Sequence, residues 1–126
     1  MQKKILVVDD HAITRLGTAL SVEALGFETE QAENGGEAFE CMKASQYALV
    51  LMDFNMPDMT GAQCAEKIRE LETGTGTRTP IVAMTASAEA ETRRVCMRAG
   101  MDDFLDKSCD LEELKLAVLK WAVTAV

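Results

Sequence analysis

Hydrophobic runs of strand length alternate along the chain with segments in which apolar residues recur at helical spacing. Three runs, at Lys4–Val8, 48–53 and 80–85, are almost continuously apolar, which is typical of strands buried on both faces of a parallel sheet. A more polar segment at 27–32 suits an edge strand, and a short strand is expected around 104–105. The pattern therefore predicts five strands.

Helix-capping signals separate these strands. Asn34, Thr60 and Asp110 stand at helix starts, each with Glu or Gln three residues later, while Gly26 and Gly100 stand where helices end. The five predicted helices cover residues 12–25, a segment that opens at 34–37, and residues 60–71, 88–99 and 110–121. Five strands alternating with five helices indicate an α/β domain, with helices on both faces of a parallel sheet and right-handed crossovers.

Length and composition narrow the class of protein. The 126 residues fit one domain, residues 1–126. The apolar fraction of 48% and the charged fraction of 27% are ordinary for a soluble protein, and no run is long enough to span a membrane. Because Lys3 and Lys4 are followed at once by Asp9 and Asp10, we recognise no signal peptide and expect a cytoplasmic location.

Charge and cysteine spacing exclude two further classes. The net charge of −8 argues against a nucleic-acid-binding surface, which needs clustered Lys and Arg to displace counterions from phosphates. The four cysteines are widely spaced, and this favours reduced thiols over a zinc site or a disulfide framework. Because of the net charge, we expect no direct binding of nucleic acid.

Polar side chains stand where the predicted strands end: Asp9, Asp10, Asp53, Thr85 and Lys107. The carboxyl ends of parallel strands meet at one edge of a sheet, where ligands bind. Three carboxylates close together stay ionised only if a cation joins them, and oxygen ligands favour Mg²⁺. A metal, a lysine and a hydroxyl recur around phosphoryl transfer. We therefore predict that Asp53 is a nucleophile that accepts a phosphoryl group as an acyl phosphate.

Four motifs resemble the receiver domains of two-component response regulators, over essentially the whole chain. They are VVDD (7–10), MDFNMPDMTG (52–61), MTA (84–86) and GMDDFLDK (100–107). The resemblance implies a flavodoxin-like, doubly wound sheet of five parallel strands in the order 2-1-3-4-5. Within this family, the sequence most resembles receiver domains of hybrid sensor histidine kinases. The chain could be a relay protein on its own or a segment of such a kinase.

The resemblance also implies roles for single residues. Asp53 would take the phosphoryl group from a phosphohistidine on a histidine kinase or a histidine phosphotransfer domain. Asp10, Asp53 and the main-chain carbonyl of Asn55 would hold Mg²⁺, and Asp9 would reach it through water. Lys107 would pair with the phosphoryl group. The domain would then be a monomeric signalling module, not an enzyme, which assists its own phosphorylation and dephosphorylation.

Other positions implied by the resemblance concern switching and lifetime. Thr85 would close its hydroxyl onto the phosphoryl group, and Phe104 is similar to the aromatic switch residue that packs inward when Thr85 moves. Ala86 is small and leaves the site open to a donor histidine. Asn55 and Ser87 stand at positions that tune hydrolysis, so we expect them to set the lifetime of the acyl phosphate.

The bond after Lys107 departs from the family pattern. Family members usually have a proline there, often after a cis peptide bond, whereas this chain has Ser108. A cis bond before a residue other than proline costs about 3 kcal/mol. Either the bond is trans and the loop is rebuilt, or the site stores strain.

The first helix presents a conflict between periodicity and resemblance. By periodicity, an apolar stripe that would normally be buried is formed by Ile13, Leu16, Leu20 and Ala24. The family register instead points another set at the sheet: Thr14, Gly17, Thr18, Ser21, Val22 and Leu25. We expect the family register, which exposes the stripe beside the site, where it could dock onto a histidine-bearing helical bundle.

Alternative functions remain open at this stage. A degenerate receiver would act by protein interaction without phosphorylation, although the intact acidic site argues against it. A haloacid-dehalogenase-like Mg²⁺ phosphohydrolase needs a second carboxylate where Asn55 stands, and a flavin mononucleotide binder needs a phosphate cradle where Asp9 and Asp10 stand. His11 could accept phosphoryl groups or bind metal, but we interpret it as a loop residue that flanks the site.

Overall fold

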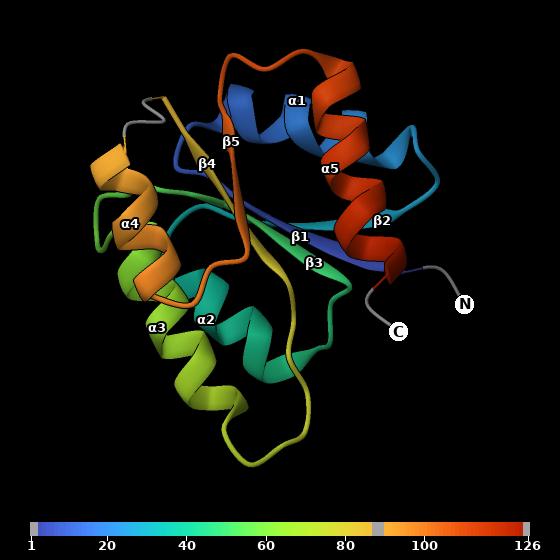
Figure 1. The fold of residues 1–126 in the computed structure, drawn as a ribbon. Coiled ribbons are helices and arrows are strands. Elements are labelled where there is room, and N and C mark those ends of the chain that lie inside the picture. Colours follow the sequence, from blue (N-terminus) through green and yellow to red (C-terminus); the bar gives the residue numbers. More distant parts are fainter. Residues whose placement is uncertain (1–2, 87–89, 125–126) are drawn as a thin grey trace.

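The structure is a computed structural model that describes residues 3–86 and 90–124 (Figure 1). Five parallel strands form a single sheet in the order β2-β1-β3-β4-β5, as predicted. The strands are β1 (Lys4–Val8), β2 (Glu28–Ala32), β3 (Leu49–Asp53), β4 (Ile81–Thr85) and β5 (Asp103–Asp106). The helices are α1 (Ala12–Glu23), α2 (Gly35–Ala44), α3 (Gly61–Glu72), α4 (Ala90–Arg98) and α5 (Leu111–Thr124).

Helices α1 and α5 cover one face of the sheet, and α2, α3 and α4 cover the other (Figure 1). Successive residues of the central strands point to opposite faces, so Leu49 and Leu51 pack under α1 and α5 while Val50 and Met52 pack under the other three helices. Every residue of β3 is buried. The predicted doubly wound fold is confirmed.

The predicted helix caps are present. The Asn34 side chain accepts a hydrogen bond from the Glu37 N–H at 2.8 Å, and Thr60 and Gln63 form a reciprocal capping box at α3. Helix α1 ends at Glu23, two residues before the predicted end, and the chain reverses through Gly26 at φ 98°. Helix α5 runs to Thr124, beyond the predicted end at 121, since nothing in the sequence there stops a helix.

The register of α1 follows the family expectation in its main result. Ile13, Leu16 and Leu20 are exposed at 89%, 50% and 56%, whereas Ala19 and Val22 are buried. The expected inward set is wrong at two members, because Thr14 and Gly17 are also exposed. Ala19 and Val22 are three residues apart and therefore lie on the same side of the helix, so the face that packs on the sheet is centred on them. Residues 14 and 17 lie away from this face.

In the part that the structure describes, no helix combines the length and the apolar character that crossing a bilayer requires.

Candidate functional site

Asp53 ends the central strand β3 and is only 1% exposed. Strands β1 and β4 flank it, so the carboxylate sits in a poorly hydrated position. Burial raises the pKa of Asp53 to about 6; nearby Asp10 and Asp9 add to the rise, and Lys107 opposes it. The carboxylate therefore carries its charge at neutral pH only at a free-energy cost.

Asp9 and Asp10 follow β1 and lie beside Asp53. Asp9 is buried, and its Oδ1 accepts the main-chain N–H of His11 at 2.9 Å, which holds the turn into α1. One ligand atom from each of Asp9, Asp10, His11 and Asp53 lies within 4.8 Å of all the others. The predicted gathering of three carboxylates at the sheet edge is confirmed, and His11 joins them.

Lys107 follows β5 and reaches the cluster. Its Nζ lies 2.8 Å from Asp53 Oδ1 and 3.9 Å from Asp9 Oδ2, and its main-chain N–H donates to the Thr85 carbonyl at 2.8 Å. There is no cis peptide bond in the described residues, so the Lys107–Ser108 bond is trans. The reach of Lys107 does not depend on a proline.

The turn after Lys107 is rebuilt around Asp106. Its Oδ1 accepts both the main-chain N–H of Ser108, at 2.8 Å, and the Ser108 hydroxyl, at 2.7 Å. These two bonds hold the pKa of Asp106 below its usual range. An aspartate turn thus takes the place of the family's proline.

The end of β4 and the middle of β5 carry the residues expected to switch. Thr85 is buried and Ala86 is exposed. Phe104 is half-buried against the α2, α3 and α4 side of the core, and the Arg93 guanidinium lies 4.1 Å from its ring centre. Ser87, expected to tune lifetime, lies outside the described residues.

The loop from β3 to α3 is tied down at both ends. Within the loop, Asn55 pairs with Thr60 through an isolated antiparallel bridge. The main-chain N–H of Asn55 donates to Asp53 Oδ1 at 3.3 Å. Gly61 closes the loop, where a Cβ atom would lie 2.6 Å from the Asp53 carbonyl oxygen. This geometry fixes the Asn55 main chain beside the acidic cluster.

Asp58 is a residue of this loop that the sequence analysis missed. Its two carboxylate oxygens accept the N–H groups of Gly35 and Gly36, at 3.1 and 2.9 Å, at the amino end of α2. The Asn-Gly-Gly start of that helix was a signal for it, since free N–H groups at a helix start attract anions.

The donor atoms fit a hard divalent cation. In the part of the chain that the structure describes, Asp10 Oδ1 and Asp53 Oδ2 are buried acceptors without a hydrogen-bond partner. Buried acceptors normally find a partner, and unpaired carboxylates repel one another. A cation that prefers oxygen ligands, such as Mg²⁺, would satisfy both atoms.

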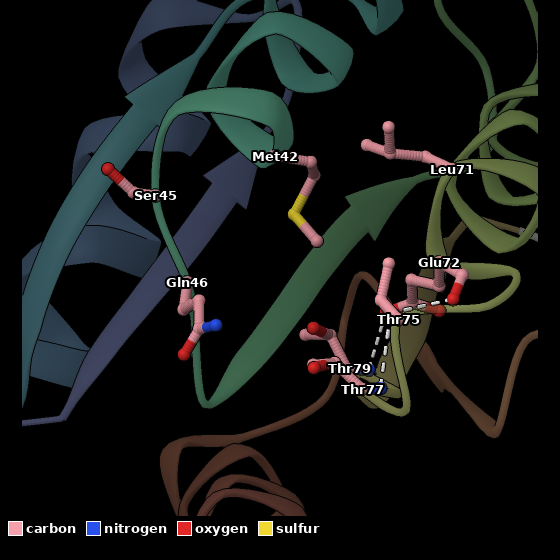
Figure 2. Close-up of a pocket in the computed structure, with 8 residues that line it drawn as sticks. All are labelled: Met42, Ser45, Gln46, Leu71, Glu72, Thr75, Thr77 and Thr79. Atoms are coloured by element: carbon pink, nitrogen blue, oxygen red, sulfur yellow. Dashed lines mark hydrogen bonds between the residues drawn. The ribbon is translucent and has the colours of Figure 1, made fainter.

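A separate pocket of about 130 Å³ (Figure 2) lies beside the amino ends of β3 and β4, whereas the acidic cluster lies at the carboxyl ends of the strands. Met42, Leu71 and Thr79 are among its lining residues, which come from the ends of α2 and α3 and from the segments that precede β3 and β4. It contains no residue of the acidic cluster.

Fold and cluster together define a doubly wound α/β domain with an acidic site at the carboxyl ends of its strands. The family model for the response regulator receiver domain matches residues 5–119, and the chain belongs to this family. The predicted family is therefore confirmed: the chain is a receiver domain of two-component phosphorelay signalling.

Receiver segments of hybrid kinases are among its relatives. The chain is 37% identical over 124 residues to the sensor histidine kinase GacS of Pseudomonas protegens, covering 98% of this chain and 14% of that protein. It is 37% identical over 118 residues to the sensor histidine kinase RcsC of Salmonella typhi, covering 94% of this chain and 12% of that protein. The chain thus spans between about one eighth and one seventh of the length of these relatives.

Solved structures share the fold. The receiver domain of sensor histidine kinase PA1611 from Pseudomonas aeruginosa, which holds a magnesium ion in its active-site cleft, matches with a TM-score of 0.88 and 29% identity, covering 98% of this chain and 100% of that one. A chain in the co-crystal structure of the Saccharomyces cerevisiae phosphotransfer protein Ypd1 with the receiver domain of Ssk1 matches with a TM-score of 0.91 and 27% identity, covering 99% and 92%.

Proposed function

We propose that Asp53 accepts a phosphoryl group from a phosphohistidine and that the domain then switches conformation or passes the group on. The observation that carries this proposal is the buried Asp53 carboxylate, ion-paired to Lys107 at 2.8 Å and flanked by Asp9 and Asp10. An Asp53 carboxylate oxygen attacks phosphorus, the P–N bond to the donor imidazole breaks, and the imidazole leaves with the bonding electron pair. The product is an acyl phosphate.

The residues around Asp53 have two proposed roles: they bind the metal ion and they neutralise charge on the phosphoryl group. Asp10, Asp53 and the Asn55 carbonyl would hold Mg²⁺, with Asp9 acting through water; when bound, the ion neutralises charge on the phosphoryl oxygens. Lys107 neutralises charge on the transferred group as well, and its present pairing with Asp53 keeps its ammonium at the place where that group arrives. These contacts assist both phosphorylation and its reversal.

The conformational response to phosphorylation involves Thr85 at the end of β4 and Phe104 in β5. The Thr85 hydroxyl closes onto the phosphoryl group, and Phe104, now half-buried under Arg93, follows it inward. Exposed Ala86 leaves room for a donor imidazole. Asn55, exposed beside the site, and Ser87 set how readily water reaches the acyl phosphate.

The partner is a histidine kinase or a histidine phosphotransfer domain. The exposed stripe of Ile13, Leu16 and Leu20 begins two residues after His11 at the site and offers an apolar surface to the helices of such a partner. We further propose that residues 1–126 form one monomeric domain in the cytoplasm, and that its net charge of −8 keeps it from binding nucleic acid directly.

Phosphoryl transfer is tested with a small phosphodonor. The wild-type protein is incubated with acetyl phosphate, with and without Mg²⁺, and its intact mass is measured beside those of Asp53→Asn and Asp110→Asn. Asp110→Asn is a matched control because asparagine caps a helix as well as aspartate does, and Asp110 accepts the Glu113 N–H at the start of α5. We expect a Mg²⁺-dependent phosphoryl adduct in the wild type and the control and none in Asp53→Asn. An adduct that persists in Asp53→Asn would refute the assignment.

A further inference from the structure

His11 is the single histidine of the chain, and its ring faces the acidic cluster. Its Nδ1 lies 3.3 Å from Asp10 Oδ1 and 3.6 Å from Asp9 Oδ1. Within the described residues, Asp10 Oδ1 has no hydrogen-bond partner, so the contact with the ring is not a hydrogen bond. The nitrogen therefore stands at ion-pair distance from this oxygen, to which a protonated ring would pair, but no hydrogen bond joins the two atoms.

The backbone position of His11 explains why its ring is available. It occupies the N-cap of α1, where Ser, Thr, Asp or Asn normally bond to the helix. The His11 side chain makes no such capping bond to the described helix, and its side chain is 71% exposed. Its main-chain N–H is held by Asp9 Oδ1 at 2.9 Å, which fixes the residue beside the carboxylates.

A second observation points to a ligand at this place. Asp53 is 1% exposed, and its Oδ2 has no hydrogen-bond partner in the described chain. The ligand atoms of Asp9, Asp10, His11 and Asp53 all lie within 4.8 Å of one another. With metal–ligand bonds of about 2.1 Å, octahedral ligands are about 3 Å apart when adjacent and about 4.2 Å apart when opposite. The His11 contacts of 3.3 and 3.6 Å fall within this range, and the 4.8 Å limit on the whole set lies slightly above it.

We propose that His11 Nδ1 is a metal ligand, and that the site therefore binds borderline transition-metal dications such as Ni²⁺ or Zn²⁺ through an imidazole nitrogen that Mg²⁺ does not use. Imidazole suits these cations, whereas Mg²⁺ prefers oxygen and keeps its waters. The inference rests on the proposed metal site at Asp10 and Asp53 and adds a nitrogen donor to it. The domain then discriminates between cations through one side chain.

Calorimetry measures the binding of Ni²⁺ and of Mg²⁺ to tag-free wild type, His11→Ala and Thr14→Ala. Thr14 is exposed on the same helix and serves as the matched control. We expect His11→Ala to weaken Ni²⁺ binding about tenfold or more and to change Mg²⁺ binding less than twofold. Equal Ni²⁺ affinity in wild type and His11→Ala would overturn the proposal, as would a variant that binds both cations more tightly, since the imidazole would then only compete with them.

Nitrogen NMR gives a readout that a structural role would not move. Because the chain has one histidine, the ring ¹⁵N signals belong to His11 alone. We expect Zn²⁺ to shift the Nδ1 resonance strongly and Mg²⁺ to leave it nearly in place; an unmoved resonance with Zn²⁺ contradicts the proposal. Asp53→Asn separates the two levels of inference: if it leaves the affinities for Mg²⁺ and Ni²⁺ unchanged, the acidic metal site itself fails, and not merely its nitrogen ligand.

Discussion

At the scale of single residues, the central property of the site is the raised pKa of the Asp53 carboxyl group. Burial raises its pKa to about 6, while Lys107 at 2.8 Å opposes the rise. The folded protein thus holds the Asp53 proton more tightly than the unfolded chain does. Folding stability from this group is present at low pH and is lost as pH rises from about 4 to about 6.

Asp53→Asn removes this cost. Without divalent cations, we expect the variant to be more stable than wild type at pH 7.5 by about 1–2 kcal/mol, with most of the difference gone at pH 4.0, where Asp53 is protonated in the folded state and about half protonated in the unfolded chain. Urea unfolding followed by Trp121 fluorescence at the two pH values measures it. Asp110→Asn should match wild type at both. A variant less stable than wild type at pH 7.5 would show that the Lys107 pair outweighs burial.

At the scale of elements, helix starts and the loops beside them hold the site together. Asp58 joins the β3–α3 loop to the start of α2 through Gly35 and Gly36. The Met59 side chain packs so closely on Gly35 that a Cβ atom there would lie 2.5 Å from it. The loop that carries Asn55 is therefore anchored to a helix from another part of the chain.

Asp58→Ala removes the anchor at the α2 start. We expect a loss of about 1 kcal/mol in the free energy of unfolding, which is typical for a lost helix cap. We also expect weaker Mg²⁺ binding, since the Asn55 carbonyl becomes less fixed. Glu91→Ala, an exposed acid in the first turn of α4, is the comparison. Unchanged Mg²⁺ affinity with reduced stability would limit Asp58 to a structural role.

The outer face of α1 tests partner docking. We expect Leu16→Glu to leave phosphorylation by acetyl phosphate unchanged and to slow transfer from a phosphorylated histidine phosphotransfer domain at least tenfold, because Leu16 is 50% exposed and belongs to the proposed contact. Leu116→Glu on α5 is the control, since it is exposed at 60% and lies outside the stripe. Equal transfer rates for wild type and Leu16→Glu would remove the stripe from the interface.

At the scale of the whole molecule, one arginine connects three segments at the edge of the sheet opposite the site. Arg69 on α3 donates to the carbonyls of Gly100 and Thr79, at 2.9 and 2.7 Å, and pairs with Asp102 Oδ2 at 2.8 Å. Asp102 Oδ2 also accepts the Ile81 N–H at 2.8 Å, at the start of β4. The glycine-rich segment before β4 is thereby held against the α4–β5 turn.

Arg69→Met keeps the length of the side chain but removes its donors. We expect a loss of about 2–4 kcal/mol in the free energy of unfolding, because Asp102 and two carbonyls lose a half-buried partner. Arg94→Met, which breaks an exposed pair with Glu91, should cost less than about 0.5 kcal/mol. Thermal and urea unfolding compare the two. Similar small losses in both variants would show that water replaces Arg69.

The sequence by itself determined the five alternating strands and helices, the helix caps and the convergence of Asp9, Asp10, Asp53 and Lys107, because apolar periodicity and cap chemistry are local and parallel strands bring their carboxyl ends to one edge. The strand order came from the family resemblance. The family resemblance also supplied the register of α1, since apolar periodicity alone would have placed Ile13, Leu16 and Leu20 against the sheet.

Only the tertiary structure decided the contacts between residues far apart in the chain. The Asp58 anchor spans 22 and 23 residues, and the Arg69 bond to Asp102 spans 33. It also decided that Asp106 and Ser108 rebuild the turn after Lys107, and that the His11 ring faces the carboxylates and not the helix it begins. These outcomes depend on side-chain direction and packed neighbours, which sequence spacing does not specify.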